Sequence, residues 1–269
     1  MSLESGIAAD DGHATRVVLQ HRGRVSMVTL NRPERRNALS RQMVCDLINA
    51  LVEADRHEQT GAIVLTGEGS AFCSGDDLSE AARTDAEAFD ETIEGLQRIT
   101  RLLLTSNKPS IAAINGAAMG GGLELTLACD LRVAAQRAMF ACPEVAWGLV
   151  CTNGASVLLP SIVGRGRARD MLLTGRTYDV AWALAAGLVS EVLPDDQVLD
   201  RAAALAEELA SRSQAVRLTR RLMSDASHEV LLRALEREAV TVGEARRTDA
   251  AEMGLREFAA RHAKKGTRQ

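Results

Sequence analysis

The order of apolar and amphipathic segments along the chain is the feature that most restricts its fold. Apolar segments of strand length alternate with helical patterns as far as residue 194. Strands are expected at residues 15–20, 24–30, 62–66, 110–115, 131–134 and 188–193, and helices at 41–55, 85–105, from 121 to about 130, 165–173 and 179–186, with a loop at 67–75. This alternation predicts an α/β core with mostly parallel strands. The wholly apolar segment 62–66 is typical of a strand buried on both faces.

The alternation ends near residue 195. Residues 196–265 contain no proline and show helical patterns in series at 197–211, 213–224, 228–243 and 248–263. Residues 1–13 lack the basic-then-apolar pattern of a signal peptide, so we interpret them as a flexible leader. We therefore divide the chain into a leader at 1–13, a core at 14–200 and a C-terminal helical region at 201–269.

Two glycine-containing loops follow expected strands and can present backbone N–H groups to a ligand. The segment Ile111–Asp130 passes from strand to helix through three consecutive glycines at 120–122, and the second loop is Ser74–Asp77. Glycine lets a backbone approach a ligand closely, and a helix start offers unpaired N–H groups and a positive dipole end. Two converging N–H groups form an oxyanion hole. Tight turns at helix starts are also often only structural, and the sequence leaves both interpretations open.

Two glutamates occur at expected helix starts. Glu124 lies in the first turn after the glycines, and Glu144 directly follows Pro143. Such glutamates often serve only as caps or complement the helix dipole. The apolar neighbours of Glu124 predict a buried helix, however, and burial raises the pKa of a carboxyl group. An acid–base role is therefore the alternative, although spacing alone does not pair the two residues.

Composition argues against several other kinds of partner. The net charge of −4 is too small to predict nucleic-acid binding, and aromatic residues make up only 3% of the chain. No apolar run approaches the roughly 20 residues that span a bilayer. The five cysteines form no C-x-x-C pair, and the five histidines are scattered without a metal or nucleophile motif. We predict a cytoplasmic protein that uses no metal, nucleic acid or membrane partner.

A series of motifs resembles the enoyl-CoA hydratase/isomerase (crotonase) superfamily. The motifs are Asn31-Arg32-Pro33 with Asn37-Ala38-Leu39, Ala71-Phe72-Cys73-Ser74-Gly75-Asp76-Asp77-Leu78, Lys108-Pro109 with Ile114-Asn115-Gly116-Ala117-Ala118-Met119-Gly120-Gly121-Gly122-Leu123-Glu124-Leu125, and Phe140 with Pro143-Glu144 and Gly148. They follow the family's order and spacing, and the resemblance covers the chain from about residue 15 to 265.

The resemblance implies a fold and a substrate class. The family fold is a spiral of ββα units followed by a C-terminal helical trimerisation region, so a homotrimer or a dimer of trimers is expected. The implied substrate is an acyl-CoA thioester, of which coenzyme A is a part, and no separate cofactor is expected. The implied reaction is the reversible syn addition of water to 2-trans-enoyl-CoA, a lyase step of fatty acid β-oxidation.

The resemblance also implies roles for four catalytic residues. The backbone N–H groups of Asp76 and Gly121 would form the oxyanion hole for the thioester carbonyl as it becomes an enolate. Glu124 would orient and activate water for attack at C3, and Glu144 would be the main proton donor to C2. Two carboxylates close together push their pKa values apart, which allows one acid and one base at neutral pH.

A set of binding residues is implied by the same resemblance. The set comprises Arg36, Ala38, Cys73, Ser74, Gly75, Asp77, Leu78, Gly120, Thr152, Phe258 and Arg261. CoA would lie along the loop of Arg36 and Ala38, with its pantetheine near Cys73 and Ser74. Phe258 and Arg261 match a tail region that reaches the nucleotide end of CoA.

Two departures from the family pattern keep the reaction open. Asp76 stands where many members have a small residue, so its side chain either alters substrate choice or faces solvent. The run 148–157, with Cys151, Thr152 and Asn153, replaces a more glycine- and proline-rich run. The alternatives are another enolate reaction (isomerisation, a specialised dehydration or C–C cleavage) and a CoA-thioester-binding protein without turnover. The presence of two glutamates favours hydration.

Overall fold

The large sheet of the fold has six strands. The computed structural model describes residues 15–225 and 228–266, so the leader expected at 1–13 lies outside the described residues. The strand order is β1 (Val17–Arg22), β2 (Val25–Leu30), β3 (Ala62–Gly67), β5 (Ser110–Ile114), β7 (Leu131–Ala135) and β10 (Glu191–Leu193). Within this sheet only β1 and β2 pair antiparallel, which confirms the predicted α/β core with mostly parallel strands.

A smaller second sheet carries the loops of interest, and the sequence did not predict it. Its order is β4 (Ala71–Cys73), β6 (Ala117–Met119), β8 (Met139–Ala141) and β9 (Tyr178–Asp179). The expectation of a loop throughout 67–75 is wrong, because β4 lies within it. Strands of two or three residues are too short to show a period of two, so sequence periodicity does not reveal them.

The two sheets are linked by repeated units of two strands and a helix. Each of the pairs β3–β4, β5–β6 and β7–β8 places its first strand in the large sheet and its second in the small one, and a helix follows. This is the ββα arrangement that the resemblance implied. The ends of β4, β6 and β8 consequently lie side by side, since the three strands are parallel neighbours.

The helices mostly match the predicted ranges. They are α1 (Arg41–Arg56), α2 (Leu78–Ala81), α3 (Ala86–Thr105), α4 (Gly121–Leu127), α5 (Ala155–Val163), α6 (Arg165–Thr174), α7 (Val180–Ala185), α8 (Val198–Ser211), α9 (Ser213–Asp225), α10 (His228–Arg246) and α11 (Asp249–Gly266), with short 3-10 turns η1 (Pro33–Arg35) and η2 (Glu144–Trp147). Ser40 caps α1, because its hydroxyl accepts a hydrogen bond from the N–H of Met43 at 3.2 Å. The helix α4 ends at Leu127, earlier than expected, and β10 begins three residues after the expected 188.

Both faces of the large sheet are covered, which explains why every residue of β3 is buried. One face packs in the main core with α1 and α3, whose buried side chains include Leu47 and Leu96. The opposite face packs against α8 through Val198, Ala202 and further alanines of that helix. The predicted division of the chain at residue 200 therefore falls inside a helix that covers the sheet, and that division stays a prediction.

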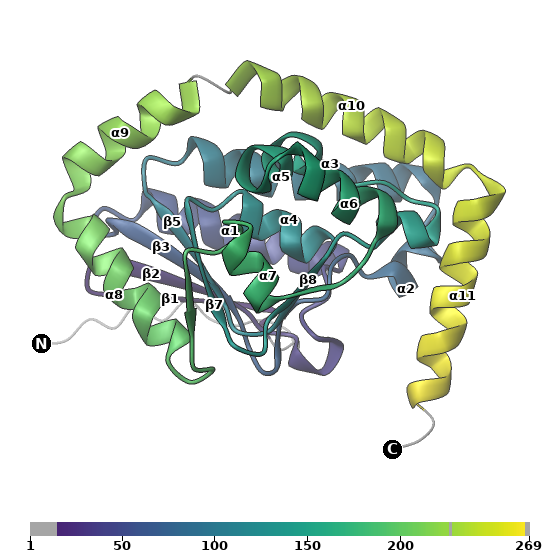
Figure 1. The fold of residues 1–269 in the computed structure, drawn as a ribbon, viewed down its shortest axis with the longest axis horizontal. Helices are drawn as coiled ribbons and strands as arrows, with labels where there is room; N and C mark the ends of the chain where they lie inside the picture. The colour runs from purple at the N-terminus through teal and green to yellow at the C-terminus, as the bar shows by residue number, and fades with distance from the viewer. Residues whose placement is uncertain (1–14, 226–227, 267–269) are drawn as a thin grey trace, which may run out of the picture.

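The C-terminal helices run around the outside of the core (Figure 1). Helix α10 contacts α3 and α5, and α11 contacts α2 and η2. Arg220 anchors α9, because its Nε lies 2.7 Å from Asp130 Oδ1 and its guanidinium also donates to the carbonyls of Leu103 and Ser106. No helix in the described ranges is long and apolar enough to cross a membrane.

Candidate active site

The two glycine loops predicted from sequence lie against each other. Gly75 follows β4 with a φ of +90°, and a Cβ on it would lie 2.7 Å from Met119 O and 3.5 Å from the backbone N of Gly121. Such a close approach leaves no room for a side chain. Within residues 15–225 and 228–266, no protein acceptor takes a hydrogen bond from the N–H of Asp76 or of Gly121. Both donors are thus available to a ligand at the same place.

Glu124 is buried beneath this place and fully engaged. Its side chain lies in the first turn of α4 and is only 1% exposed. Thr152 donates to it from N (3.0 Å to Oε1) and Oγ1 (3.3 Å to Oε2), and Asn153 donates from N (3.3 Å) and Nδ2 (3.0 Å). The expectation of a desolvated carboxyl is confirmed, and Glu124 is more than a helix cap because its side chain binds a distant loop.

Burial raises the pKa of Glu124 well above its ordinary value. The nearby charges of Glu144, Glu238 and Asp76 act in the same direction, while the N–H of Thr152 acts against them. The charge of Glu144 therefore acts on Glu124, which spacing in the sequence could not show.

Glu144 is the first residue of η2 and turns its carboxyl toward the glycine loop. Its Oε1 is buried without a hydrogen-bond partner, and a Cβ on Gly120 would lie 3.0 Å from that oxygen. Burial, with a smaller contribution from the charge of Asp76, raises the pKa of Glu144 to about 7, although its own N–H acts in the opposite direction. A carboxyl with such a pKa exchanges its proton near neutral pH.

Asp76 places a third carboxyl group beside these two. Its Oδ1 is buried without a hydrogen-bond partner, and a Cβ on Gly121 would lie 2.4 Å from that oxygen. Burial raises the pKa of Asp76 to about 6. The alternative that this side chain simply faces solvent is therefore wrong, since the oxygen is turned inward.

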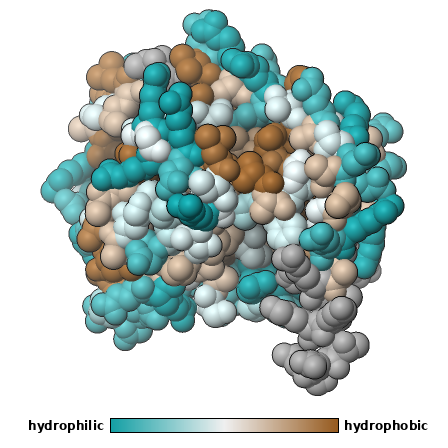
Figure 2. All heavy atoms as spheres, turned by 45° about the vertical axis from the view of Figure 1, so that its right-hand side comes forward, coloured by the Kyte–Doolittle hydropathy of each residue, from teal (hydrophilic) through white to brown (hydrophobic). Residues whose placement is uncertain are grey.

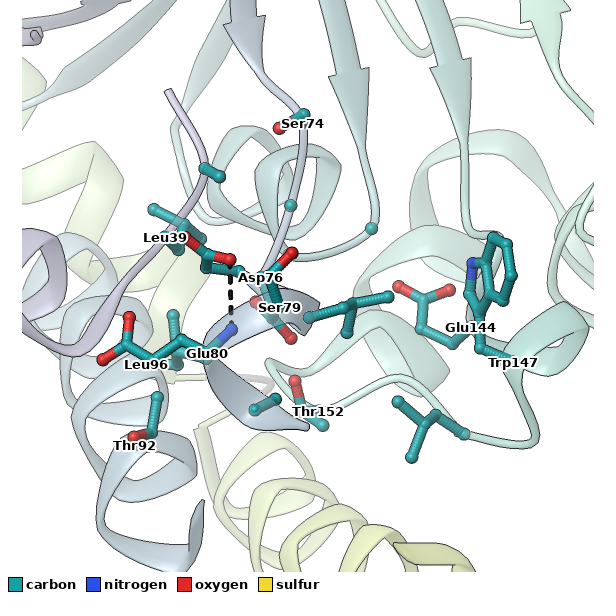
Figure 3. Close-up of a pocket in the computed structure, with 18 of the residues that line it drawn as sticks. Leu39, Ser74, Asp76, Ser79, Glu80, Thr92, Leu96, Glu144, Trp147 and Thr152 are labelled. Atoms are coloured by element: carbon teal, nitrogen blue, oxygen red, sulfur yellow. Dashed lines mark hydrogen bonds between the residues drawn. The ribbon is translucent and has the colours of Figure 1, made fainter. Parts of the chain in front are cut away.

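Asp76, Glu144 and the glycine loops border a pocket of about 530 Å³ (Figure 3). Asp76 and Glu144 reach it from different elements, and Thr92 and Leu96 of α3 form another part of its wall. Its lining also includes the apolar residues Leu39, Leu78, Phe89, Ile93, Leu149, Val150 and Val242. The space suits an apolar chain that ends near the two free N–H groups. Glu124 is not part of the lining, but Thr152, which binds it, is.

Most of the predicted binding residues lie on the pocket wall. The lining includes Arg36, Ala38, Ser74, Gly75, Asp77, Leu78, Gly120, Thr152 and Phe258. Phe258 packs edge-on against Trp147, with ring centroids 5.2 Å apart. The side chain of Arg261 lies outside the described part of the chain.

Figure 2 shows the face of the molecule on the side where α2 and α11 lie in Figure 1. Apolar side chains gather near the centre of this face, between hydrophilic ones.

Two of the predicted binding residues are occupied by contacts within the protein. Cys73 is buried outside the lining, where its thiol donates to Asn37 O at 3.1 Å, and burial raises its pKa to about 12. Asp77 binds Arg32 at 2.8 Å and Arg35 at 3.6 Å. Burial alone would raise the pKa of Asp77, but the two arginines outweigh it and lower that pKa.

The loop that holds Glu124 is itself held by residues that the sequence did not single out. Glu238 of α10 accepts hydrogen bonds from the N–H groups of Gly154 (2.6 Å) and Ser156 (3.0 Å). Gln97 of α3 donates from Nε2 to Thr152 O at 2.9 Å and to Leu235 O at 2.7 Å. These contacts join segments that are far apart along the chain, so no local sequence signal could have revealed them.

Comparisons with known proteins agree on one family. Residues 20–266 match the family model described as enoyl-CoA hydratase/isomerase. The chain is 39% identical over 198 residues to the probable enoyl-CoA hydratase echA8 of Mycobacterium tuberculosis, covering 73% of this chain and 76% of that protein. A crystal structure of an enoyl-CoA hydratase/isomerase from Pseudoalteromonas atlantica is similar with a TM-score of 0.83 and 30% identity, over 91% of this chain and 97% of that one. A monofunctional enoyl-CoA isomerase from M. smegmatis is similar with a TM-score of 0.66 and 33% identity, over 79% and 94% of the two chains.

Proposed function

Because the chain belongs to the enoyl-CoA hydratase/isomerase family and has its crotonase-like fold, we propose that it is an enoyl-CoA hydratase. Its substrate is an acyl-CoA thioester, and it adds water reversibly to 2-trans-enoyl-CoA to give 3-hydroxyacyl-CoA. The observation that supports this reaction best is the pair of glutamates, buried Glu124 and half-buried Glu144 with its buried Oε1, beside two backbone N–H groups that are available to a ligand.

The two N–H groups supply the electrostatic part of catalysis. In the proposed complex the N–H groups of Asp76 and Gly121 bind the thioester oxygen, which gains negative charge as water attacks C3. Oxyanion-hole donors stabilise such a transition state by about 3 kcal/mol each, because they are already oriented before the charge develops. The start of α4 adds the positive end of its dipole to the same place.

The hydrogen bonds around the two glutamates suggest which of them carries a proton. Thr152 and Asn153 donate to Glu124, and donors of this kind favour its ionised form. Glu144 lacks such donors at Oε1 and has a pKa of about 7. We therefore assign water activation to the Glu124 carboxylate and proton delivery to C2 to the Glu144 carboxylic acid.

The remaining features of the proposed function concern binding and assembly. CoA lies along Arg36 and Ala38 with its pantetheine near Ser74, and it enters as part of the substrate, so no separate cofactor is proposed. The nucleotide end lies toward Phe258 and Arg261. The protein acts in the cytoplasm, in fatty acid β-oxidation, as a homotrimer or a dimer of trimers.

The test is hydration of crotonyl-CoA, followed by loss of the enoyl absorbance and by NMR of the 3-hydroxy product. The isosteric changes Glu124→Gln and Glu144→Gln should each lower kcat by about 10²- to 10⁴-fold, the usual contribution of a general acid or base. If either variant stays within about tenfold of the wild type, the role assigned to that glutamate is wrong.

Isomerisation of the double bond is the second candidate, because the chain is also similar to a monofunctional enoyl-CoA isomerase. A 3-enoyl-CoA distinguishes the two reactions. An isomerase converts it to the 2-enoyl-CoA without taking up water, whereas the proposed hydratase leaves it unchanged. Binding of enoyl-CoA with no turnover of either kind would instead support a non-catalytic CoA-thioester-binding protein.

A further inference from the structure

Two carboxyl oxygens on the pocket side of the site have no protein partner. In the described part of the chain, Asp76 Oδ1 and Glu144 Oε1 are both buried without a hydrogen bond. The two oxygens lie close to adjacent glycines. A Cβ added to Gly121 would lie 2.4 Å from Asp76 Oδ1, and a Cβ added to Gly120 would lie 3.0 Å from Glu144 Oε1. The absence of side chains on these glycines provides the room for both carboxyl groups.

Buried polar oxygens without partners are uncommon in native proteins, and those that occur often belong to functional sites. Two carboxylates at one site repel each other, so that one of them keeps a proton well above its ordinary pKa. A single proton retained by the two carboxyl groups reduces this repulsion, and the protonated group gains an O–H donor.

We propose that Asp76 and Glu144 form a carboxyl pair that holds one proton, and that Asp76 is the positioning residue that keeps Glu144 ready to donate it. This inference rests on the proposed function, because it concerns the proton that Glu144 delivers to C2. It goes beyond the use of the Asp76 backbone N–H, since it assigns a role to the side chain. The charge of Asp76 and burial both raise the pKa of Glu144, which agrees with this pairing.

Neither carboxyl group of the pair has an ion-pair partner in the described part of the chain. Among residues 15–225 and 228–266, no arginine, lysine or histidine forms an ion pair with Asp76 or Glu144. Two arginines of the neighbouring loop, Arg32 and Arg35, bind Asp77.

The pocket is also lined by the basic residues Arg35, Arg36 and Arg41, and the remaining titratable groups around the pair are acids or thiols. Cys73 of β4 and Cys142 at the end of β8 are buried thiols with raised pKa values, so they stay neutral. Glu124 of α4 is a further buried acid, bound by Thr152 and Asn153, so it brings no positive charge to the pair. Glu80 of α2 lines the pocket farther along the same loop and accepts from the N–H of Arg41 at 3.4 Å. Burial of both carboxyl groups favours retention of the proton.

The proton balance follows from this arrangement. During hydration the oxygen of water bonds to C3, one proton of that water passes to Glu124, and the proton of the pair passes from Glu144 to C2. The pair is then left with two negative charges. It regains one proton from solvent before the next turnover, and Glu124 releases its proton to solvent, so the net reaction is the addition of one water.

The variants Asp76→Asn and Asp76→Ala test the pair, because both remove the side-chain charge and keep the backbone N–H. The pH profile of hydration is measured for each variant. Loss of the Asp76 charge lowers the pKa of Glu144, so the alkaline limb of kcat should move to lower pH by about one unit. In the reverse dehydration, where Glu144 acts as the base, the acid limb should move in the same direction. The control is Glu94→Gln, which removes an exposed charge from α3 and should leave both limbs in place.

A second measurement does not depend on activity. Carboxyl ¹³C NMR of the ligand-free protein follows the titration of Glu144, identified by its loss in Glu144→Gln. With Asp76→Asn its midpoint should fall, whereas a midpoint unchanged in both Asp76 variants overturns the pair. If the wild type hydrates no enoyl-CoA but this shift is seen, the proposed function fails and the pair stands. If hydration is normal and neither limb nor midpoint moves, the pair fails and the hydratase stands.

Discussion

At the scale of single residues, the carboxyl group of Glu144 makes the stability of the fold depend on pH. Burial and the charge of Asp76 raise its pKa from 4.5 to about 7. Between these values the unfolded chain has lost the proton and the folded chain has kept it, so stability falls as pH rises through this window. At low pH both the folded and the unfolded chain hold the proton, so ionisation of Glu144 takes no stability from the fold.

The isosteric change Glu144→Gln removes this ionisation, so it should stabilise the protein at alkaline pH. We expect a gain of about 3 kcal/mol in the free energy of unfolding at pH 8, and little difference from the wild type at pH 4. Urea unfolding at one fixed protein concentration measures both values. Equal free energies of unfolding at pH 8 would show that Glu144 ionises in the fold as easily as in solvent.

The candidate acids could be predicted from sequence, but their surroundings could not. Glu124 and Glu144 each stand at a helix start next to recognisable motifs, so local sequence was enough to single them out. Their chemistry depends on contacts from elsewhere, because Thr152 and Asn153 bind Glu124 across 28 and 29 residues. The inward direction of the Asp76 side chain likewise depends on the loop around Gly121, which no local pattern describes.

At the scale of elements, helix α5 obtains its N-terminal cap from another helix. Gly154, the residue before α5, has a φ of +88° and no side chain to serve as a cap. The carboxylate of Glu238 on α10 accepts from Gly154 N and Ser156 N instead. Because Thr152 and Asn153 directly precede this cap, Glu238 also fixes the loop that holds Glu124.

Removal of this cap should affect stability and catalysis together. Glu238→Ala leaves the buried N–H of Gly154 and the more exposed N–H of Ser156 unpaired, and we expect a loss of about 2 kcal/mol in the free energy of unfolding. Glu238→Gln is milder, and since it removes a charge that helps to raise the pKa of Glu124, it should also shift the pH profile of kcat. Glu236→Gln, an exposed change on the same helix, is the matched control. A Glu238→Gln enzyme with a wild-type pH profile would limit Glu238 to a structural role.

The sequence predicted the long elements well and the short ones poorly, for a physical reason. Helix α3 has an apolar stripe that repeats over 20 residues, and strand β3 is recognisable as a wholly apolar run. Strands β4, β6 and β8 have three residues each and are defined by pairing between segments that are distant in sequence. The small sheet that carries the candidate site could therefore be recognised only from the tertiary structure.

At the scale of the whole molecule, the C-terminal helices form an outer arm that is only partly covered by the core. Arg220 ties α9 to Asp130, while other positions of the same helix carry exposed apolar side chains. Leu222 is 73% exposed and Met223 is 72% exposed, and Val230 and Val240 of α10 are also exposed. Apolar side chains gathered on one arm are typical of a surface that packs against another chain. This distribution supports the proposed trimer.

Sedimentation velocity tests the proposed assembly. At micromolar concentration the wild type should sediment as a trimer or as a dimer of trimers. The double change Leu222→Glu with Met223→Glu places two charges on the exposed part of α9, so it should shift the protein toward monomer because charges are costly to desolvate in an interface. Leu173→Glu is the control, since Leu173 is 74% exposed and belongs to α6, not to the C-terminal helices. A monomeric wild type would contradict the proposed trimer, whereas a trimer that withstands the α9 change would place the interface on other helices of the arm.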